Sequence, residues 1–278
     1  MEVAKDALVV LAAAAHPDDI EFLMAGTLLR LREAGAEVHM WNLANGCCGS
    51  VAHSREGIAG LRWQEAQASA RLADAEMHPP LFDDLAIFYD APSLARVAAV
   101  IRQIRPALLL VPSPQDYMED HQNASRLLVS GAFVQGMPNF ATQPPQPPWD
   151  GPVAIYHAMP YGLRDGLRQM IRPGCYVDVT PVLPRKREML AQHRTQKEWL
   201  DASQGLDAYL NAMEDMSRTV GRLSGRFAHA EGWRRHSHLG FAAPDYDPLA
   251  WLLPATCWVD PEYERRLDTP GGRDREGE

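Results

Sequence analysis

An apolar run that ends in a polar cluster constrains the fold of this chain most. Residues 7–15 are uncharged and rich in Val, Leu and Ala, which is typical of a strand buried on both faces of a parallel sheet. Pro17 cannot continue a strand ladder and favours an extended backbone at His16. We therefore expect the strand to stop at His16, and a helix that carries Leu28 and Leu29 to follow it.

The polar cluster consists of His16, Asp18 and Asp19, at the carboxyl end of this strand, where α/β sheets place their ligand sites. Left unpaired, such a cluster would be costly to bury. His16 and Asp19 can hold one divalent cation, and Asp18 can take a proton from a water at the metal. The alternative is that an Asp caps the helix and His16 packs at the strand end. The order of the residues behind a buried strand favours the metal site.

Length, charge and cysteine content limit the class of protein. A chain of 278 residues forms one large domain, or one domain with a small appendage. Its net charge of -9 argues against nonspecific nucleic-acid binding. No stretch approaches the ~20 apolar residues of a membrane span. Its 4 Cys are too few for a disulfide framework, so we expect reduced thiols and a cytoplasmic protein.

The motif Ala15-His16-Pro17-Asp18-Asp19 after a first strand resembles the signature of the PIG-L/LmbE-type zinc deacetylases, which remove N-acetyl groups from amino sugars. The resemblance implies that His16 and Asp19 bind zinc and that Asp18 is the general base. The family completes its site with a His from a later Asp-His pair.

A suitable pair, Asp120-His121, follows the apolar run 107–111 at the opening of an expected helix. The resemblance therefore implies His121 as the third ligand. Two His, one carboxylate and an open position fit a catalytic zinc, and iron accepts the same ligands. Asp120 can support the site from behind a ligand.

Two further residues are candidate substrate contacts by resemblance. Arg62 begins the sequence Arg62-Trp63-Gln64-Glu65-Ala66, which is similar to a family motif, Arg-x-x-Glu-Ala, whose Arg faces the sugar. From the residues alone, Arg62 would be an exposed helix charge. Asp90 ends an expected strand over residues 85–89, where the family often has an Asp that contacts substrate hydroxyls. Asp90 is equally suited to cap the next helix.

The chain departs from the family pattern at Met118. Many members have His-Pro-Asp-His where this chain has Met118-Glu119-Asp120-His121, and their first His helps to stabilise the transition state. Met118 can neither donate a proton nor carry charge. Tyr117 can polarise a carbonyl through its hydroxyl, which makes it a third candidate substrate contact. His157 and His193 are the other candidates for the missing role.

A polyproline-like connector over residues 143–148 marks a boundary. We expect residues 1–140 to form a Rossmann-like metal-binding core and residues 150–200 to complete the same domain. The latter part should carry a helix over residues 184–200, with Lys186 as a solvated charge. Residues 201–278 are expected to be a C-terminal extension, with a disordered tail from about residue 268.

The alternation of short apolar strands and amphipathic helices predicts an α/β fold, arranged as a Rossmann-like three-layer sandwich with a mainly parallel central sheet. With the resemblance, the predicted function is zinc-dependent removal of an N-acetyl group from an amino-sugar-type small molecule or glycoconjugate. Binding to nucleic acid or membrane is not expected, and a homo-oligomer is left open. The alternatives are a deacylase of another N-acyl natural product and a metal-bound binding protein that has lost catalysis at Met118.

Overall fold

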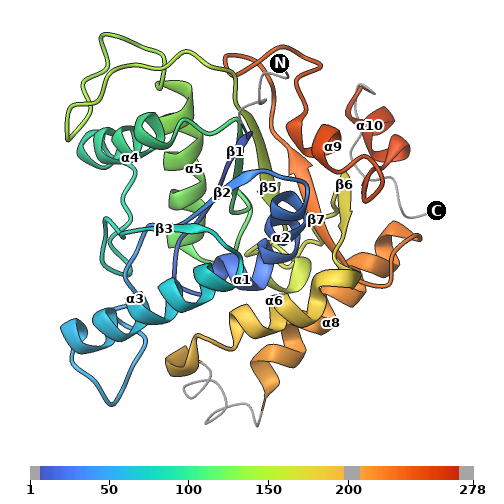
Figure 1. The fold of residues 1–278 in the computed structure, drawn as a ribbon, viewed down its shortest axis with the longest axis horizontal. Coiled ribbons are helices and arrows are strands. Elements are labelled where there is room, and N and C mark those ends of the chain that lie inside the picture. Colours follow the sequence, from blue (N-terminus) through green and yellow to red (C-terminus); the bar gives the residue numbers. More distant parts are fainter. Residues whose placement is uncertain (1–6, 197–206, 269–278) are drawn as a thin grey trace, which may run out of the picture.

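The computed structural model describes residues 7–196 and 207–268, which form one eight-stranded sheet with helices on both faces (Figure 1). The strands are β1 (Val9–Ala14), β2 (Glu37–Asn42), β3 (Glu76–His78), β4 (Leu108–Val111), β5 (Ala154–Ala158), β6 (Cys175–Asp178), β7 (Ala230–Arg235) and β8 (Cys257–Val259). The helices are α1 (Asp19–Leu23), α2 (Ala25–Glu33), α3 (Arg55–Leu72), α4 (Ala91–Ile104), α5 (Glu119–Phe133), α6 (Leu183–Leu190), α8 (Ala208–Ser224), α9 (Pro248–Leu252) and α10 (Pro261–Leu267).

The sheet order is β3-β2-β1-β4-β5-β7-β6-β8. The strands β1 to β5 pair in parallel, whereas β5–β7, β7–β6 and β6–β8 pair antiparallel. The predicted α/β fold with a mainly parallel sheet is therefore confirmed, and the antiparallel end is an addition to it. Because β7 lies between β5 and β6, part of the segment 201–278 is built into this sheet instead of following it as an appendage. The expected tail lies outside the described residues, except for Asp268.

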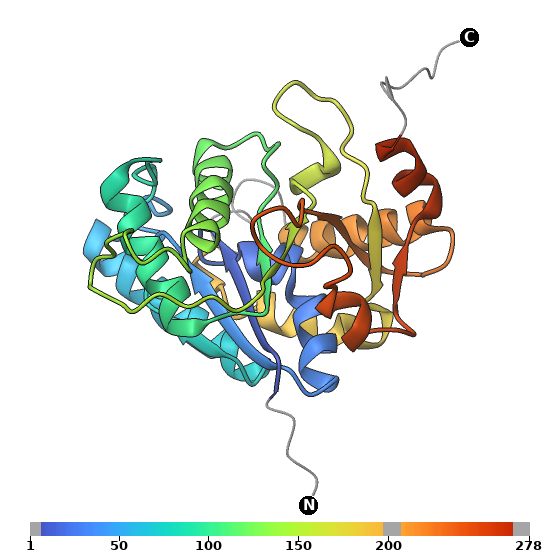
Figure 2. The ribbon, with the colours of Figure 1, turned by 90° about the horizontal axis from the view of Figure 1, so that it is seen from above.

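The sheet separates two apolar cores, and β1 contributes to both. Val10, Ala12 and Ala14 face the core under α1, α2, α6 and α8. Leu11 and Ala13 face the core under α4 and α5. Figures 1 and 2 show these helices on opposite sides of the sheet. A strand in this position needs apolar side chains on both faces, which explains the continuous apolar run in the sequence.

Two elements differ from their predicted form. Residues 85–89 are not a strand: Leu85 has a φ of 61°, in the left-handed region, which interrupts an extended backbone. The third strand of the sheet is instead Glu76–His78. The helix expected over residues 184–200 is interrupted: α6 ends at Leu190, and a separate helical turn begins at Arg194. His193 lies in this break and is buried. Residues 197–200 of the expected helix lie outside the described residues.

Lys186 is not a solvated charge. It is buried, and its Nζ donates to Glu231 Oε1 at 2.6 Å. The same carboxylate accepts from the backbone N–H groups of Gly26 and Thr27, both at 2.7 Å, at the first turn of α2. Glu231 of β7 therefore joins α6, α2 and the antiparallel end of the sheet, and it compensates the charge of the buried Lys186.

Replacement of Glu231 by alanine should lower the free energy of unfolding by about 3–5 kcal/mol, because Lys186 would remain buried without a counter-charge. Urea denaturation measures this difference. Glu188→Ala is the matched control, since Glu188 is exposed on α6. Equal stability of the two variants would contradict the assigned role of Glu231.

Within the described ranges, no helix is long and apolar enough to cross a membrane.

Candidate active site

The candidate site lies at the carboxyl ends of the parallel strands, between β1 and β4. The chain runs from β1 to β2 and β3 on one side, then returns to the other side of β1 as β4. Such a reversal leaves a crevice at the strand ends, where α/β folds bind ligands. His16 follows β1, and His121 lies in the first turn of α5 after β4. Two segments about a hundred residues apart are thus brought to one place by the strand order.

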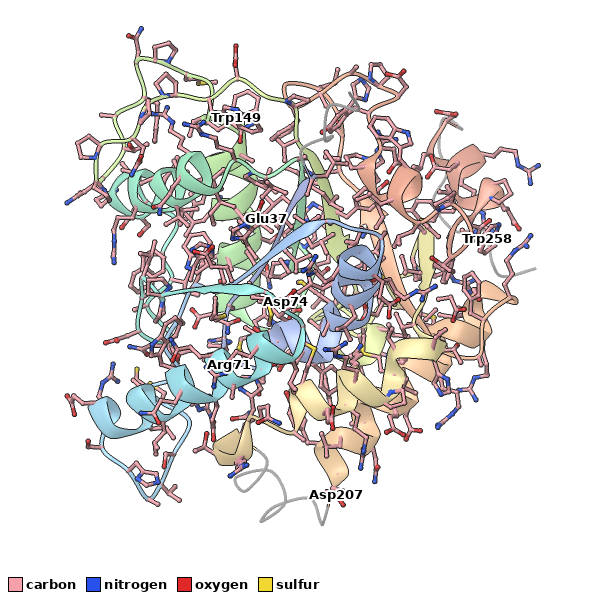
Figure 3. The ribbon with its side chains drawn as sticks, in the orientation of Figure 1. Glu37, Arg71, Asp74, Trp149, Asp207 and Trp258 are labelled. Carbon is pink, nitrogen blue, oxygen red and sulfur yellow. The ribbon has the colours of Figure 1, made fainter. Side chains whose placement is uncertain are left out.

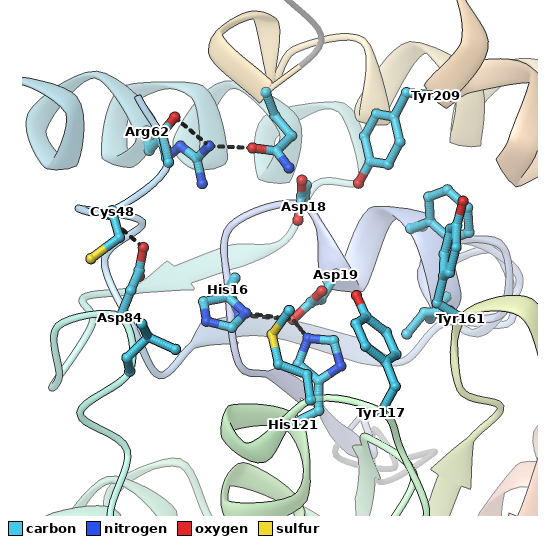
Figure 4. Close-up of a pocket in the computed structure, with 16 residues that line it drawn as sticks. His16, Asp18, Asp19, Cys48, Arg62, Asp84, Tyr117, His121, Tyr161 and Tyr209 are labelled. Atoms are coloured by element: carbon cyan, nitrogen blue, oxygen red, sulfur yellow. Dashed lines mark hydrogen bonds and ion pairs between the residues drawn. The ribbon is translucent and has the colours of Figure 1, made fainter. Parts of the chain in front are cut away.

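Three side chains predicted as metal ligands meet there: His16, Asp19 and His121 (Figure 4). One potential ligand atom from each lies within 4.8 Å of the others. Asp19 Oδ2 is 3.4 Å from Nε2 of His121 and 3.7 Å from Nδ1 of His16. Two imidazoles and a carboxylate, with the remaining side open to a cavity, are the donors of a catalytic divalent-metal site. The residues present therefore fit the metal that the family resemblance implies.

Each histidine has a carboxylate behind it. Asp120 Oδ2 lies 2.9 Å from Nε2 of His16, and Asp116 Oδ1 lies 3.1 Å from Nδ1 of His121. Such partners fix the tautomer and orientation of a metal-binding imidazole. They leave Nδ1 of His16 and Nε2 of His121 facing Asp19. The supporting role that the sequence suggested for Asp120 agrees with this geometry, whereas Asp116 was not foreseen.

The imidazoles and carboxylates of the site shift one another's pKa values. Burial alone would lower the pKa of His16, but its hydrogen bonds with Asp120 and Asp19 raise the pKa to about 10. Burial likewise opposes ionisation of Asp19, yet the charges of His121 and His16 hold the pKa of Asp19 well below its usual range. A site that favours positive charge on both imidazoles also favours a bound cation.

Asp18 lies beside this group and is itself buried. Its φ of 109° is a strained value for a residue other than glycine, and such strain is often found at functional sites. Burial and the neighbouring charge of Asp19 raise the pKa of Asp18 to about 6. The hydroxyl of Tyr209 faces its carboxylate in Figure 4. Asp18 is thus held apart from the three converging ligands, at the wall of the cavity.

A cavity of about 420 Å³ opens above the cluster. Figure 4 shows a polar side with Arg62, Cys48 and Asp84, and an aromatic side with Tyr117, Tyr161 and Tyr209. The arrangement can hold a small molecule that has a polar and an apolar face.

Of the three residues predicted as substrate contacts, Arg62 and Tyr117 line the cavity and Asp90 does not. Asp90 is exposed, caps α4 by accepting from the backbone N–H of Ser93 at 2.8 Å, and does not line the cavity. Asp90 therefore has the position of a helix cap, which was the alternative to a substrate contact.

Arg62 is buried under the glycine loop that follows β2. A Cβ at Gly46 or Gly49 would lie 2.2 Å from the Arg62 side chain, so the two glycines leave the room that it occupies. Its guanidinium donates to the carbonyl of Gly49 and to Gln196. The exposed-helix alternative for Arg62 is therefore wrong: the side chain is fixed at the cavity wall.

Only some of the candidates for the transition-state role that Met118 cannot fill lie at the cavity. Tyr117 and Met118 both line the cavity. His157 does not line it: its Nε2 lies 3.0 Å from Nδ1 of His236, on the antiparallel side of the sheet. His193 also lies outside the lining, with its Nε2 3.1 Å from Glu21 Oε1. Tyr117 is the candidate with access to a ligand in the cavity.

Sequence reasoning missed Asp84 and Tyr209. Asp84 accepts from the backbone N–H groups of Gly46 and Cys48, which fixes the loop at the cavity rim. Tyr209 reaches the site from α8, more than 180 residues after Asp18. Asp84 directly precedes a segment wrongly predicted as a strand, and the sequence around Tyr209 contains no motif.

Asp116→Asn should weaken the affinity of the site for a divalent metal about 10–100-fold, because the amide supports His121 less well than the carboxylate does. Competition with a chromophoric chelator measures this affinity. Asp245→Asn is a control at an exposed position. Unchanged affinity in Asp116→Asn would rule out Asp116 as the supporting group.

Comparisons with known proteins agree with the geometry. Residues 11–132 match the model of the PIG-L family, described as GlcNAc-PI de-N-acetylase. The diacetylchitobiose deacetylase of Thermococcus kodakarensis is 26% identical over 194 residues, which are 67% of this chain and 69% of that protein.

Two solved structures share the fold. One is N,N'-diacetylchitobiose deacetylase from Pyrococcus horikoshii in complex with its inhibitor MPG, with a TM-score of 0.69, 23% identity, and coverage of 88% of this chain and 90% of that one. The other is GalB, the 4-carboxy-2-hydroxymuconate hydratase from Pseudomonas putida KT2440, with a TM-score of 0.67, 20% identity, and coverage of 83% and 96%. Because one is a deacetylase and the other a hydratase, this fold alone does not specify the reaction.

The resemblance inferred from the sequence motifs is confirmed by the match of residues 11–132 to the PIG-L family model and by the similarity to the diacetylchitobiose deacetylases. The matched segment runs from β1 into α5, so it contains all three residues of the His16–Asp19–His121 group.

Proposed function

We propose that this protein is a zinc-dependent hydrolase that removes an N-acetyl group from an amino-sugar-type substrate. The observation that carries the proposal is the meeting of His16, Asp19 and His121 at one end of a cavity, with the carboxylate of Asp18 beside them. The family match and the related diacetylchitobiose deacetylase support the same reaction. The β3-β2-β1-β4-β5 order supports a Rossmann-like description of the core.

His16, Asp19 and His121 would hold the metal, and ferrous iron accepts the same donors. When bound, the metal would polarise the amide carbonyl and lower the pKa of a water molecule next to it. Asp18 accepts a proton from the attacking water at its carboxylate and returns it to the departing amine nitrogen. One water and one amide thus become acetate and a free amine, with no other reactant.

Tyr117 is proposed to take the role that a histidine has in many family members. Burial raises the pKa of its hydroxyl to about 12, so the group is protonated near neutral pH. It can therefore donate a hydrogen bond to the substrate carbonyl oxygen as negative charge develops there. Arg62 and Asp84, on the polar side, can bind sugar hydroxyls, since one donates and the other accepts.

An amine-release assay tests the proposal. The metal-free chain is loaded with Zn²⁺ or with Fe²⁺ under anaerobic conditions, then incubated with N-acetylglucosamine, diacetylchitobiose and glycosides of N-acetylglucosamine. We expect equal amounts of acetate and free amine from at least one of them. A fully metal-loaded chain that releases amine from no N-acyl compound would contradict the proposal and favour a binding protein.

The cavity also supports a second candidate, a deacylase that acts on longer N-acyl chains. Phe22 and Leu23 line the same side as Tyr161, and the ring centroids of Phe22 and Tyr161 are 5.2 Å apart. This wall can bury an alkyl chain. N-butyryl and N-octanoyl glucosamine therefore belong in the panel, and a higher kcat/KM for them than for the acetyl compound would favour the second candidate.

A further inference from the structure

A second group of metal-binding side chains lies on the outer strands of the sheet, away from the cavity. It consists of Glu37 and His39 on β2, and Glu76 and His78 on β3. In the parallel pairing of these strands, His39 is opposite Glu76, and Trp41 is opposite His78. Residues two apart on a strand point to the same face, so all four side chains share one face of the sheet. None of them lines the active-site cavity.

Three potential ligand atoms of this group lie close to one another. His39 Nδ1 lies 2.9 Å from His78 Nε2 and 3.8 Å from Glu76 Oε2. Two nitrogens bound to one tetrahedral zinc at ~2.0–2.1 Å would be roughly 3.3 Å apart. The two imidazoles would therefore need to separate by a few tenths of an ångström, and to turn so that both nitrogens face the ion. The ring planes are 26° apart and the ring centroids are 5.1 Å apart, so the two nitrogens face each other between the rings.

Glu37 supplies the partner that a metal-binding histidine usually has. Its Oε1 lies 3.3 Å from Nε2 of His39. If Nε2 of His39 carries the proton and donates to Glu37, Nδ1 of His39 is a free acceptor that faces His78 and Glu76. This is the carboxylate–histidine–metal arrangement, and it repeats the relation of Asp120 to His16 in the active site.

Burial distinguishes this group from ordinary surface charge. His39 and His78 are 6% and 8% exposed, whereas Glu37 and Glu76 reach solvent. A neutral imidazole can bind a metal through either ring nitrogen, and Nε2 is the nitrogen of His78 that faces His39. The carboxylates supply the negative charge and leave the site open to a cation from solution.

We propose that His39, His78 and Glu76 form a second binding site for a divalent transition metal, with zinc as the expected ion, which ties the short outer strand β3 to β2. On binding, His78 moves its proton from Nε2 to Nδ1, so no other reactant is needed. The site has three protein ligands and one position open to water. The proposal is independent of the reaction at His16, Asp19 and His121.

Zinc stoichiometry tests the proposal. The described residues contain a further candidate group, Cys47, Cys48 and Asp84, so the test uses a background variant, His16→Ala, His121→Ala, Cys48→Ser. This chain is stripped with chelator, dialysed against Zn²⁺ and analysed for bound metal. We expect about one zinc per chain. Adding His78→Gln should remove it, and adding His53→Gln, at an exposed histidine, should not.

A second measurement does not depend on the folding of a variant. Crystals of the unmodified chain grown with Zn²⁺ should show an anomalous peak at the zinc edge between His39 Nδ1 and His78 Nε2. Glu76→Gln, at a solvent-exposed position, should weaken zinc binding in the background chain about tenfold or more. The proposal would be overturned by a background chain that binds no zinc, by zinc that remains after His78→Gln, or by the absence of an anomalous peak at this place.

Discussion

Replacement of Asp18 by asparagine should lower kcat on the best N-acetylated amino sugar by about 10²–10⁴-fold, with the metal content unchanged. Asparagine has nearly the same shape, so the strained backbone at this position and the contact with Tyr209 should persist. It cannot accept a proton at the pH of the reaction. Because Asp18 is not one of the three converging ligands, the metal should stay bound. Steady-state kinetics together with elemental analysis of the same sample separates the two effects.

Asp90→Asn is the matched control for this substitution. Asp90 caps α4 outside the cavity, and asparagine caps a helix equally well. Its kcat should equal that of the unmodified chain. Full activity of Asp18→Asn with metal bound would show that the proton is taken by another group. A large loss in Asp90→Asn would instead return Asp90 to the list of substrate contacts.

Replacement of His121 by alanine should abolish both metal binding at the active site and turnover. The substitution removes one of three ligands and takes the imidazole away from the carboxylates of Asp116 and Asp19. We expect metal affinity to fall by more than the roughly 10–100-fold that follows the loss of a supporting group, and amine release to fall to background. Metal affinity is measured by chelator competition, and turnover by the amine-release assay.

His53→Gln provides the control for His121→Ala, since His53 is exposed and belongs to none of the three candidate metal-binding groups among the described residues. A second metal at His39 and His78 would remain bound in His121→Ala, so total metal content alone is insufficient. Activity after metal is added back shows whether the active site of His121→Ala still binds metal. If His121→Ala binds active-site metal normally and turns over substrate, the ligand assignment is wrong.

The sequence allowed the parallel part of the fold to be predicted because burial on both faces leaves a plain signal. β1 and β4 are apolar runs that a proline soon follows, Pro17 after β1 and Pro112 after β4, and each run precedes part of the candidate site. The antiparallel part was not predicted, because β7 contains Glu231, Arg234 and Arg235 and has no such pattern. Its burial depends on pairing with β5 and β6, which are far away in the sequence.

A residue of the site could be predicted where its sequence neighbours form a recognisable motif or follow an apolar strand. His16, Asp18 and Asp19 are nearly consecutive, and His121 follows a second apolar strand, so their proximity follows from the strand order. Tyr209 gives no local signal, because its position depends on the packing of α8 against α1 and α6. Lys186 was misjudged for the same reason: its counter-charge, Glu231, comes from another strand 45 residues later.

The most direct test of the account is a paired measurement of acetate and free amine from an N-acetylated amino sugar, with and without metal in the same preparation. The account predicts equimolar release of both products by the metal-loaded chain, none by the chelator-treated chain, and recovery when zinc or ferrous iron is returned. Release that persists without metal, or a fully loaded chain that releases neither product, would contradict it.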